Sequence, residues 1–359
     1  MNRTDKGRFD AEFELDVYDE IHEDYTEWVE ATIDKETTYS KLSKDVKRYL
    51  SWCETNDVHP FEATEIDIRA YLKYLITEDI AETTITSLFS TVSKYYHYLL
   101  SDPETDVEID SNPTSEIDLT RDFELSYTSD YIRSIRREGR QDIIAPDYKS
   151  LKPIFDNVPG VRPAVRTRNE LICRLLWQTA LRADELSRVK LNKIDFAKRE
   201  IEVRSSKLDP EEHELYHRRV WWEPHLDLLM RRWVDSHRSQ LNREASKRYL
   251  LIGENAGYDR PNNHYQLKPG TISKIVKDAA HEAGIQEPLV RRSDGSVQQW
   301  LYTAHRLRHA RISHLCNKVD DLSIHFVRML AGHESIDTTL DYVKTDWQEA
   351  RRAYQQEVY

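Results

Sequence analysis

Apolar residues in the front third of the chain recur at the spacing of an α-helix, every three or four positions. The first such helix is predicted to bury a face made of Leu42, Val46, Tyr49, Leu50 and Cys53. The second begins at an N-cap, Thr64, with the carboxylates of Glu65 and Asp67 in its first turn. It is predicted to bury Ile68, Tyr71, Leu72, Leu75 and Ile76.

A third helical pattern completes this front part. Its apolar face is made of Ile85, Leu88, Phe89, Val92, Tyr95, Tyr96 and Leu99. Asp102-Pro103 should end it, because proline cannot continue a helix. The three patterns together predict a small helical bundle that closes near Asn112-Pro113.

The rear part mixes helical and strand patterns. Leu171, Ile172, Leu175 and Leu176 make one helix face, whereas Glu200–Arg204 alternates apolar and polar residues as a strand does. Asp209-Pro210 reads as a turn, and His217–Trp222 as the returning strand. Further helices are predicted over 224–239, 271–283, 304–316, 322–331 and 336–343. The fold class is therefore mainly α with a small β-sheet.

These patterns divide the chain into four parts. The predicted boundaries are an acidic leader at 1–36, a helical domain at 37–118, a linker at 119–146 and a second domain with a carboxy-terminal tail at 147–359. The leader is expected to be partly helical. The linker shows no clean period of apolar residues, but it has room for one short helix. The linker also carries arginines that can follow a phosphate backbone, although an ordinary soluble loop explains them equally well.

Charge is unevenly distributed. Residues 1–120 hold 11 Lys and Arg against 29 Asp and Glu, and the remaining residues hold 41 against 35. A basic rear part hints at contact with a polyanion, although a solvated acidic surface is the simpler explanation of charge alone. Abundant carboxylates would also suit a cell with high internal salt, which activity measurements across salt concentrations would test.

Location follows from what the sequence lacks. Cys53, Cys173 and Cys316 are odd in number, far apart and form no CxxC pair, so no disulfide framework is predicted. The first residues show no apolar signal segment, and a mean hydropathy of -0.75 argues against a membrane span. A cytoplasmic protein without membrane contact is expected.

Candidate chemistry lies in four places. Arg182 and Glu185 are three residues apart, as are His305 and Arg308, so each pair shares a helix face. Gly332 suits the end of a helix and is followed by His333, and Tyr342 comes nine residues later. Taken singly, each is more often an ordinary surface or packing residue.

Their order carries more information than any one of them. Leu-Arg-x-x-Glu-Leu, then His-x-Leu-Arg-His, then Gly-His, then a tyrosine strongly resembles the tyrosine recombinases, which include phage integrases and Xer recombinases. The resemblance covers about residues 165–345. It implies a helical SAM-like core-binding domain and an α+β catalytic domain. Ala180 and Ala331 depart from the family pattern, which has glycine and leucine at these places.

The resemblance also implies a lysine on the β-hairpin, for which Lys207 is the matching position although it lacks the usual glycine neighbours. It implies a 3′-phosphotyrosyl intermediate on Tyr342 and strand exchange through a Holliday junction in a homotetramer on double-stranded DNA recombination sites. The tail at 346–359 would then dock onto a neighbouring protomer. No metal or nucleotide cofactor is expected. Whether accessory DNA-binding proteins take part is left open.

Elementary chemistry assigns each group a role. Arg182 and Arg308 can neutralise the charge that builds on a phosphate under attack, and Glu185 can orient Arg182. His305 is the natural base for the phenol, and His333 can hydrogen-bond a phosphate oxygen. Lys207 can donate a proton to the leaving 5′-oxygen.

Two other functions compete with this one. The first is a DNA-binding regulator on the same fold that no longer cuts DNA, which the presence of the whole residue set argues against. The second is a metal-dependent nuclease, suggested by the histidines at 305, 309, 314, 325 and 333, but none of these five forms an HxH or HExxH motif.

Overall fold

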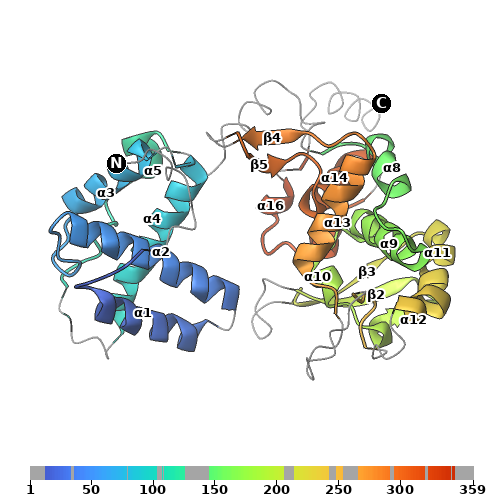
Figure 1. The fold of residues 1–359 in the computed structure, drawn as a ribbon, viewed down its shortest axis with the longest axis horizontal. Helices are drawn as coiled ribbons and strands as arrows, with labels where there is room; N and C mark the ends of the chain where they lie inside the picture. Colours follow the sequence, from blue (N-terminus) through green and yellow to red (C-terminus); the bar gives the residue numbers. More distant parts are fainter. Residues whose placement is uncertain are drawn as a thin grey trace, which may run out of the picture. The chain divides into compact units, whose positions relative to one another are not determined.

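The computed structural model divides the chain into two compact units, Met1–Ser134 and Ile135–Tyr359 (Figure 1). The structure describes residues 13–33, 36–78, 80–102, 107, 109–125, 145–205, 214–241, 248–253, 266–291, 295–319, 322–340 and 342–343. Within these ranges every helix is too short or too polar to cross a lipid bilayer. Several sequence predictions lie outside them: the Asp209-Pro210 turn, Lys207, the linker arginines at 133, 136, 137 and 140, and the tail at 346–359.

The amino-terminal unit is helical in its described part. Its helices are α1 (Asp19–Thr32), α2 (Glu36–Thr55), α3 (Glu65–Thr77), α4 (Glu82–Ser101) and the short α5 (Leu119–Phe123). The predicted capping of α3 is confirmed, because Thr64 and Asp67 form a capping box. α4 ends at Ser101, directly before the predicted Asp102-Pro103 stop.

Tyrosines dominate the core of this unit. Tyr49 and Tyr96 share a hydrogen bond of 2.6 Å between their hydroxyls, and Tyr96 donates to the carbonyl of Pro60 at 2.9 Å. Helix α1, predicted as part of a separate leader, adds Tyr25 and Val29 to the same core. These buried rings bind the first helix to the bundle, since aromatic side chains bury large apolar areas.

The prediction that Ile76 belongs to the core of the bundle is wrong. Ile76 is 41 % exposed, whereas Ile68, Leu72 and Leu75 of the same helix are fully buried. At about 100° per residue, Ile76 lies roughly 80° around the helix from Ile68, at the edge of the buried face. It also lies in the last turn of α3, which ends at Thr77.

The carboxy-terminal unit combines helices with small sheets. Its longer helices are α8 (Tyr148–Asp156), α9 (Pro163–Thr179), α13 (Pro269–Glu282), α14 (Ala304–Lys318) and α15 (Ile324–Ala331). Its shorter ones are α10 (Ala183–Ser187), α11 (Asp227–Arg231), α12 (Arg238–Leu241) and α16 (Asp337–Leu340), with single 3₁₀ turns at Leu191–Lys193 and Pro224–Leu226. A π-helical turn at Arg232–His237 interrupts the helix predicted over 224–239.

Two antiparallel sheets lie in the described part of this unit. The first has the order β1 (Ile194–Asp195), β2 (Glu200–Arg204) and β3 (His217–Trp221). β2 and β3 are the predicted hairpin strands, and their register pairs Ile201 with Val220. The second sheet, β4 (Pro288–Arg291) with β5 (Val297–Trp300), was not predicted.

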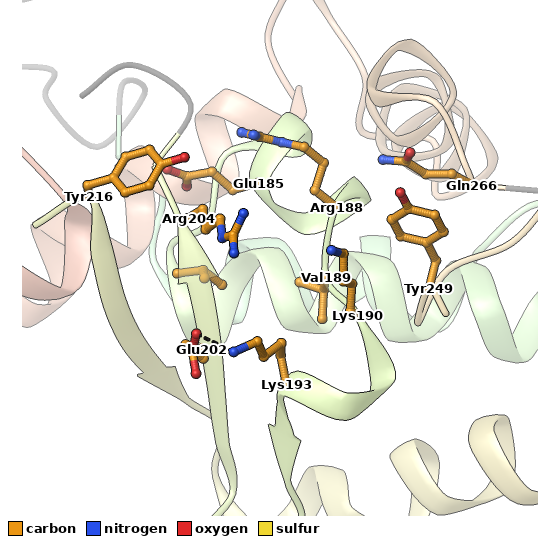
Figure 2. Close-up of a pocket in the computed structure, with 11 residues that line it drawn as sticks. Glu185, Arg188, Val189, Lys190, Lys193, Glu202, Arg204, Tyr216, Tyr249 and Gln266 are labelled. Atoms are coloured by element: carbon orange, nitrogen blue, oxygen red, sulfur yellow. Dashed lines mark hydrogen bonds and ion pairs between the residues drawn. The ribbon is translucent and has the colours of Figure 1, made fainter. Parts of the chain in front are cut away.

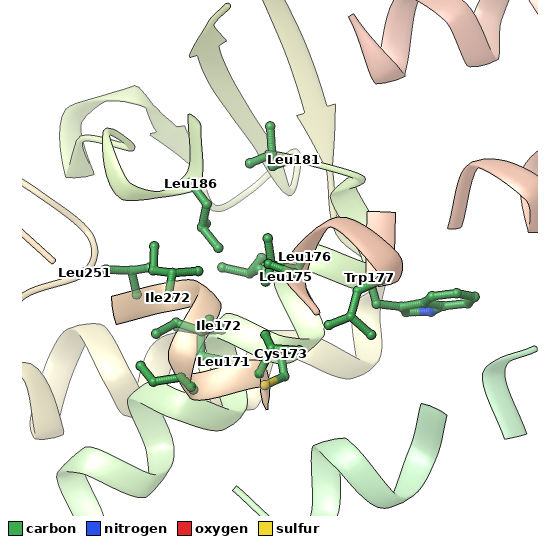
Figure 3. Packing of buried hydrophobic residues seen from close by; sticks show 14 of the residues in the cluster. Leu171, Ile172, Cys173, Leu175, Leu176, Trp177, Leu181, Leu186, Leu251 and Ile272 are labelled. Atoms are coloured by element: carbon green, nitrogen blue, oxygen red, sulfur yellow. The ribbon is translucent and has the colours of Figure 1, made fainter. Parts of the chain in front are cut away.

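Helix α9 runs through the centre of this unit's core. Its predicted face, Leu171, Ile172, Leu175 and Leu176, is fully buried. Figure 3 shows these side chains beside Leu186, Leu251 and Ile272, which come from other parts of the unit. Because α9 leads directly into Ala180, Leu181 and Arg182, this packing fixes the start of the candidate site.

Candidate active site

Arg182 and Glu185 are held by the first turn of α10. Arg182 is the N-cap residue, and its backbone N–H donates to Glu185 Oε2 at 2.9 Å. Its Nη1 also donates to Glu185 Oε1 at 3.1 Å. The predicted spacing of three residues therefore closes a local ring that fixes both side chains.

Glu185 is the centre of a buried arginine cluster. Arg218 on β3 donates from Nη1 to Oε1 at 3.1 Å and from Nη2 to Oε2 at 2.8 Å. Arg308 Nη1 lies 4.0 Å from Oε2. Burial raises the pKa of Glu185, but the charges of Arg218, Arg308 and Arg182 outweigh it and lower the pKa to about 2. The carboxylate is therefore ionised under all ordinary conditions.

Arg308 lies on α14 and points into the protein. It is 2 % exposed, and its guanidinium donates to the backbone carbonyls of Ala180 and Ala331. Burial lowers its pKa to about 9, and the positive charges of Arg182 and Arg218 act in the same direction. Three guanidinium groups thus face one carboxylate, and this excess of buried positive charge favours binding of an anion.

The turn after α15 packs on this cluster. Gly332 ends the helix in the left-handed conformation, with φ of 64°, as the sequence predicts. Arg218 Nε donates to the carbonyl of Leu330 at 3.0 Å, and Arg182 Nη2 lies 3.5 Å from the carbonyl of Gly332. The turn therefore places His333 next to the arginines.

His333 is buried and shares a hydrogen bond of 2.9 Å with the hydroxyl of Thr339 through its Nδ1. Burial lowers its pKa to about 3, and the charges of Arg308, Arg182 and Arg218 contribute in the same direction. The imidazole is therefore neutral near pH 7 and has one ring N–H to donate.

Tyr342 follows α16 and lies against this turn. Its ring stacks near that of His333, with centroids 6.0 Å apart and planes at 22°. Asn317 donates from Nδ2 to its backbone carbonyl at 2.8 Å, which ties it to α14. Its hydroxyl lies 2.6 Å from Nδ1 of His309, and it is near enough to Arg308 for their charges to interact.

His305 lies further out on α14. It is exposed, and its Nε2 lies 2.7 Å from Nε2 of His309. The predicted residues Arg182, Glu185, Arg308, His333 and Tyr342 are thus brought together directly, while His305 reaches the phenol through His309. Lys207 lies outside the described residues.

Sequence reasoning missed two residues of the site, Arg218 and His309. Arg218 occupies an inward position of β3, on the same face as Val220, so strand alternation predicts a buried charge that needs a partner. His309 comes four residues after His305, on the same face of α14. Both signals were present in the sequence.

A basic pocket opens beside Glu185 (Figure 2). It has a volume of about 230 Å³, and its basic lining comes from Arg188, Lys190, Lys193 and Arg204. Lys193 is paired with Glu202 at 2.7 Å. Within the described part of the chain Arg204 makes no salt bridge, so its charge is available to a phosphate.

Family models match both units. The model of the phage integrase family matches residues 149–349, and that of the phage integrase N-terminal SAM-like domain matches residues 22–106. The predicted fold, mainly helical with a SAM-like domain and an α+β catalytic domain, is confirmed.

Curated relatives and solved structures agree. The chain is 22% identical to tyrosine recombinase XerD of Shewanella oneidensis, over 86% of this chain and 85% of the relative. It is 28% identical to XerA of Pyrococcus furiosus, over 51% and 52%. Among solved structures, the Tn1549 transposon integrase with transposon right end DNA matches with a TM-score of 0.65 and 14% identity, covering 94% of this chain and 99% of that one. The chain therefore belongs to the phage integrase family, the family of tyrosine-type site-specific recombinases.

Proposed function

We propose that this protein cuts and rejoins DNA strands at recombination sites through a 3′-phosphotyrosyl intermediate on Tyr342, with neither metal nor ATP. The observation that carries this proposal is the buried excess of positive charge around Glu185, with Tyr342 near enough to interact with the charge of Arg308. The site residues are Arg182, Glu185, Lys207, His305, Arg308, His333 and Tyr342.

Phosphate charge explains the arginines. A DNA phosphodiester carries one negative charge, and attack on phosphorus adds a second in the transition state. Arg182 is partly exposed and has donors available to a nonbridging oxygen. Arg308 is buried, so it contributes its positive charge from the protein interior. With Nδ1 of His333 accepting from Thr339, its Nε2–H can donate to the same phosphate. Glu185 holds Arg182 in place for this contact.

The covalent step conserves bond energy. The oxygen of Tyr342 forms a bond to phosphorus, and the bond from phosphorus to the 5′-oxygen breaks. The phenol loses its proton to His305 as the base, and Lys207 protonates the leaving 5′-oxygen. Because the phosphotyrosyl ester stores the energy of the broken bond, a second 5′-hydroxyl can attack it without ATP.

DNA is the proposed partner, and four protomers are proposed to exchange two duplexes through a Holliday junction. Solved relatives support the choice of DNA: the Tn1549 integrase binds transposon end DNA, and a lambda integrase dimer, with a TM-score of 0.56 and 17% identity, binds a core site. A cytoplasmic location and accessory DNA-binding proteins stay predictions.

An SDS-stable adduct tests the proposal. The protein is mixed with a library of nicked duplexes of random sequence, and covalently captured DNA is sequenced. The wild type should give an adduct that survives EDTA and carries phosphate on the tyrosine, and Tyr342→Phe should give none. DNA binding without any adduct would favour the inactive regulator, and cleavage that EDTA abolishes would favour the metal-dependent nuclease.

A further inference from the structure

The hydroxyl of Tyr342 lies within hydrogen-bond distance of a residue to which the proposed mechanism gives no role. His309 Nδ1 is 2.6 Å from the hydroxyl, and the two rings lie with centroids 5.1 Å apart. His309 sits one residue after Arg308, so α14 presents the arginine to the interior and the imidazole to the phenol.

A second hydrogen bond continues the chain outward. Nε2 of His309 lies 2.7 Å from Nε2 of His305, and the two rings meet edge to face. If Nδ1 of His309 accepts from the phenol, its proton is on Nε2, which donates to His305. His305 then carries its own proton on Nδ1 and is exposed to solvent. With this assignment every nitrogen of the two rings has a role, and a proton can pass from the phenol outward.

We propose that His309 is a catalytic residue, the immediate acceptor of the Tyr342 proton and the link that passes a proton on to His305. This inference rests on the proposed function and deepens it. As the phenol oxygen attacks phosphorus, its O–H bond breaks and an N–H bond forms at Nδ1 of His309. The proton on Nε2 of His309 moves to Nε2 of His305, whose Nδ1 proton can leave to solvent. No proton is created or lost, and His309 ends neutral.

The surroundings of His309 favour passing a proton on over holding it. The groups that act on it are His305, Arg306 and Arg308 from its own helix and His333 from the turn after α15, in addition to Tyr342. Burial lowers its pKa to about 2, and its interactions with these two histidines and two arginines act in the same direction. A long-lived imidazolium is therefore disfavoured at this position, so a proton that arrives from the phenol must move on.

Variants at His309 test the assignment. The substrate is a nicked duplex of a sequence captured by the wild type, made once with ordinary chemistry and once with sulfur in place of the bridging 5′-oxygen. His309→Gln should slow adduct formation by about 10²- to 10⁴-fold, the usual contribution of a general base. The loss should persist on the sulfur substrate, because its thiolate leaves without a proton while the phenol still needs a base. His314→Gln, on the same helix but against Trp177, is the matched control and should react at the wild-type rate.

The pH profile separates chemistry from a structural effect. Without a base only the ionised phenol attacks, so the rate of His309→Gln should rise about tenfold per pH unit as the fraction of ionised phenol grows. The wild type should rise less steeply, and the gap between the two should narrow at high pH. A constant ratio across the pH range would overturn the proposal and leave His309 a packing residue.

A measurement without DNA tests the contact between Tyr342 and His309 even if the His309 variant fails to fold. In ¹⁵N-histidine spectra of the full chain, Tyr342→Phe should shift the imidazole resonance assigned to His309, since it removes the hydroxyl at Nδ1. No shift would overturn the inference, as would wild-type adduct formation by a folded His309→Gln. Absence of an adduct from the wild type itself would instead defeat the proposed function and this inference together.

Discussion

Arg218 and Glu185 meet through two parallel hydrogen bonds inside the carboxy-terminal unit, Nη1 to Oε1 at 3.1 Å and Nη2 to Oε2 at 2.8 Å. Their side chains are 3% and 0% exposed. The same guanidinium reaches the carbonyl of Leu330 through Nε, so one side chain joins α10, β3 and the end of α15. A fork-shaped donor is needed for this geometry, and lysine cannot replace it.

Replacing Arg218 should therefore destabilise the protein. Arg218→Met leaves the buried carboxylate of Glu185 with poorer compensation, and breaking a buried ion pair costs about 3–5 kcal/mol. The unfolding free energy from urea titration checks this value. Arg219→Met, on the exposed face of the same strand, should change it by less than about 0.5 kcal/mol. Equal stability of both variants would contradict the role given to Arg218.

Acid should weaken the cluster at Glu185 in a defined range. Its pKa is lowered from 4.5 to about 2, so its stabilising contribution is complete above pH 4.5 and disappears as the pH falls through 2. The contribution is about 3 kcal/mol for this shift. Glu185→Gln should be less stable than the wild type at pH 7, and the difference should shrink between pH 5 and pH 2. A difference that stays constant over this range would show that Glu185 is not held ionised by its arginines.

A methyl group at position 332 should disturb the site through Arg218. A Cβ built on Gly332 would lie 2.8 Å from the Arg218 guanidinium, and φ is 64°. Gly284 has a similar φ of 69° but nothing within 4 Å of such an atom. Both alanine variants should lose about 1 kcal/mol to backbone strain. Only Gly332→Ala should also slow adduct formation, whereas equal activity would mean that the guanidinium moves aside without consequence.

The basic pocket should contribute to DNA affinity without taking part in the chemistry. Arg204→Ala should weaken binding and reduce the slope of log affinity against log salt by about 1, because one phosphate contact is lost. Lys193→Ala is the matched comparison, and its effect should be smaller because Glu202 already neutralises this lysine. Fluorescence anisotropy over a salt series measures both. Identical slopes for Arg204→Ala and the wild type would place DNA elsewhere.

Helical patterns predicted the amino-terminal core well, because each helix buries one continuous face. Ile85, Val92, Tyr95 and Leu99 are all buried in α4 as their spacing indicates. The error at Ile76 arises at a helix end, where tertiary cover decides burial and periodicity does not. The strands β4 and β5 were missed because they are four residues long and carry little apolar alternation.

Helical spacing alone predicted the site where its groups occur in local pairs, whereas His333 and Tyr342 were predicted from the order of the motifs along the chain. Arg182 with Glu185 and His305 with Arg308 could be found from spacing of three residues. Arg218 binds Glu185, which lies 33 positions earlier in the chain. His309 contacts Tyr342, which lies 33 positions later, so no local spacing links either pair. Which imidazole meets the phenol depends on how the segment after α15 turns back onto α14, and that is a property of the tertiary structure.

Arg308 is anchored by main-chain oxygens, those of Ala180 and Ala331. A carbonyl belongs to every residue type, so evolution can exchange the side chains at both places without removing either acceptor. The two alanines that stand where the family pattern has glycine and leucine are examples of such freedom. The limit is conformational: Ala180 has φ of 53°, so bulky β-branched residues are excluded there although the oxygen they would offer is the same.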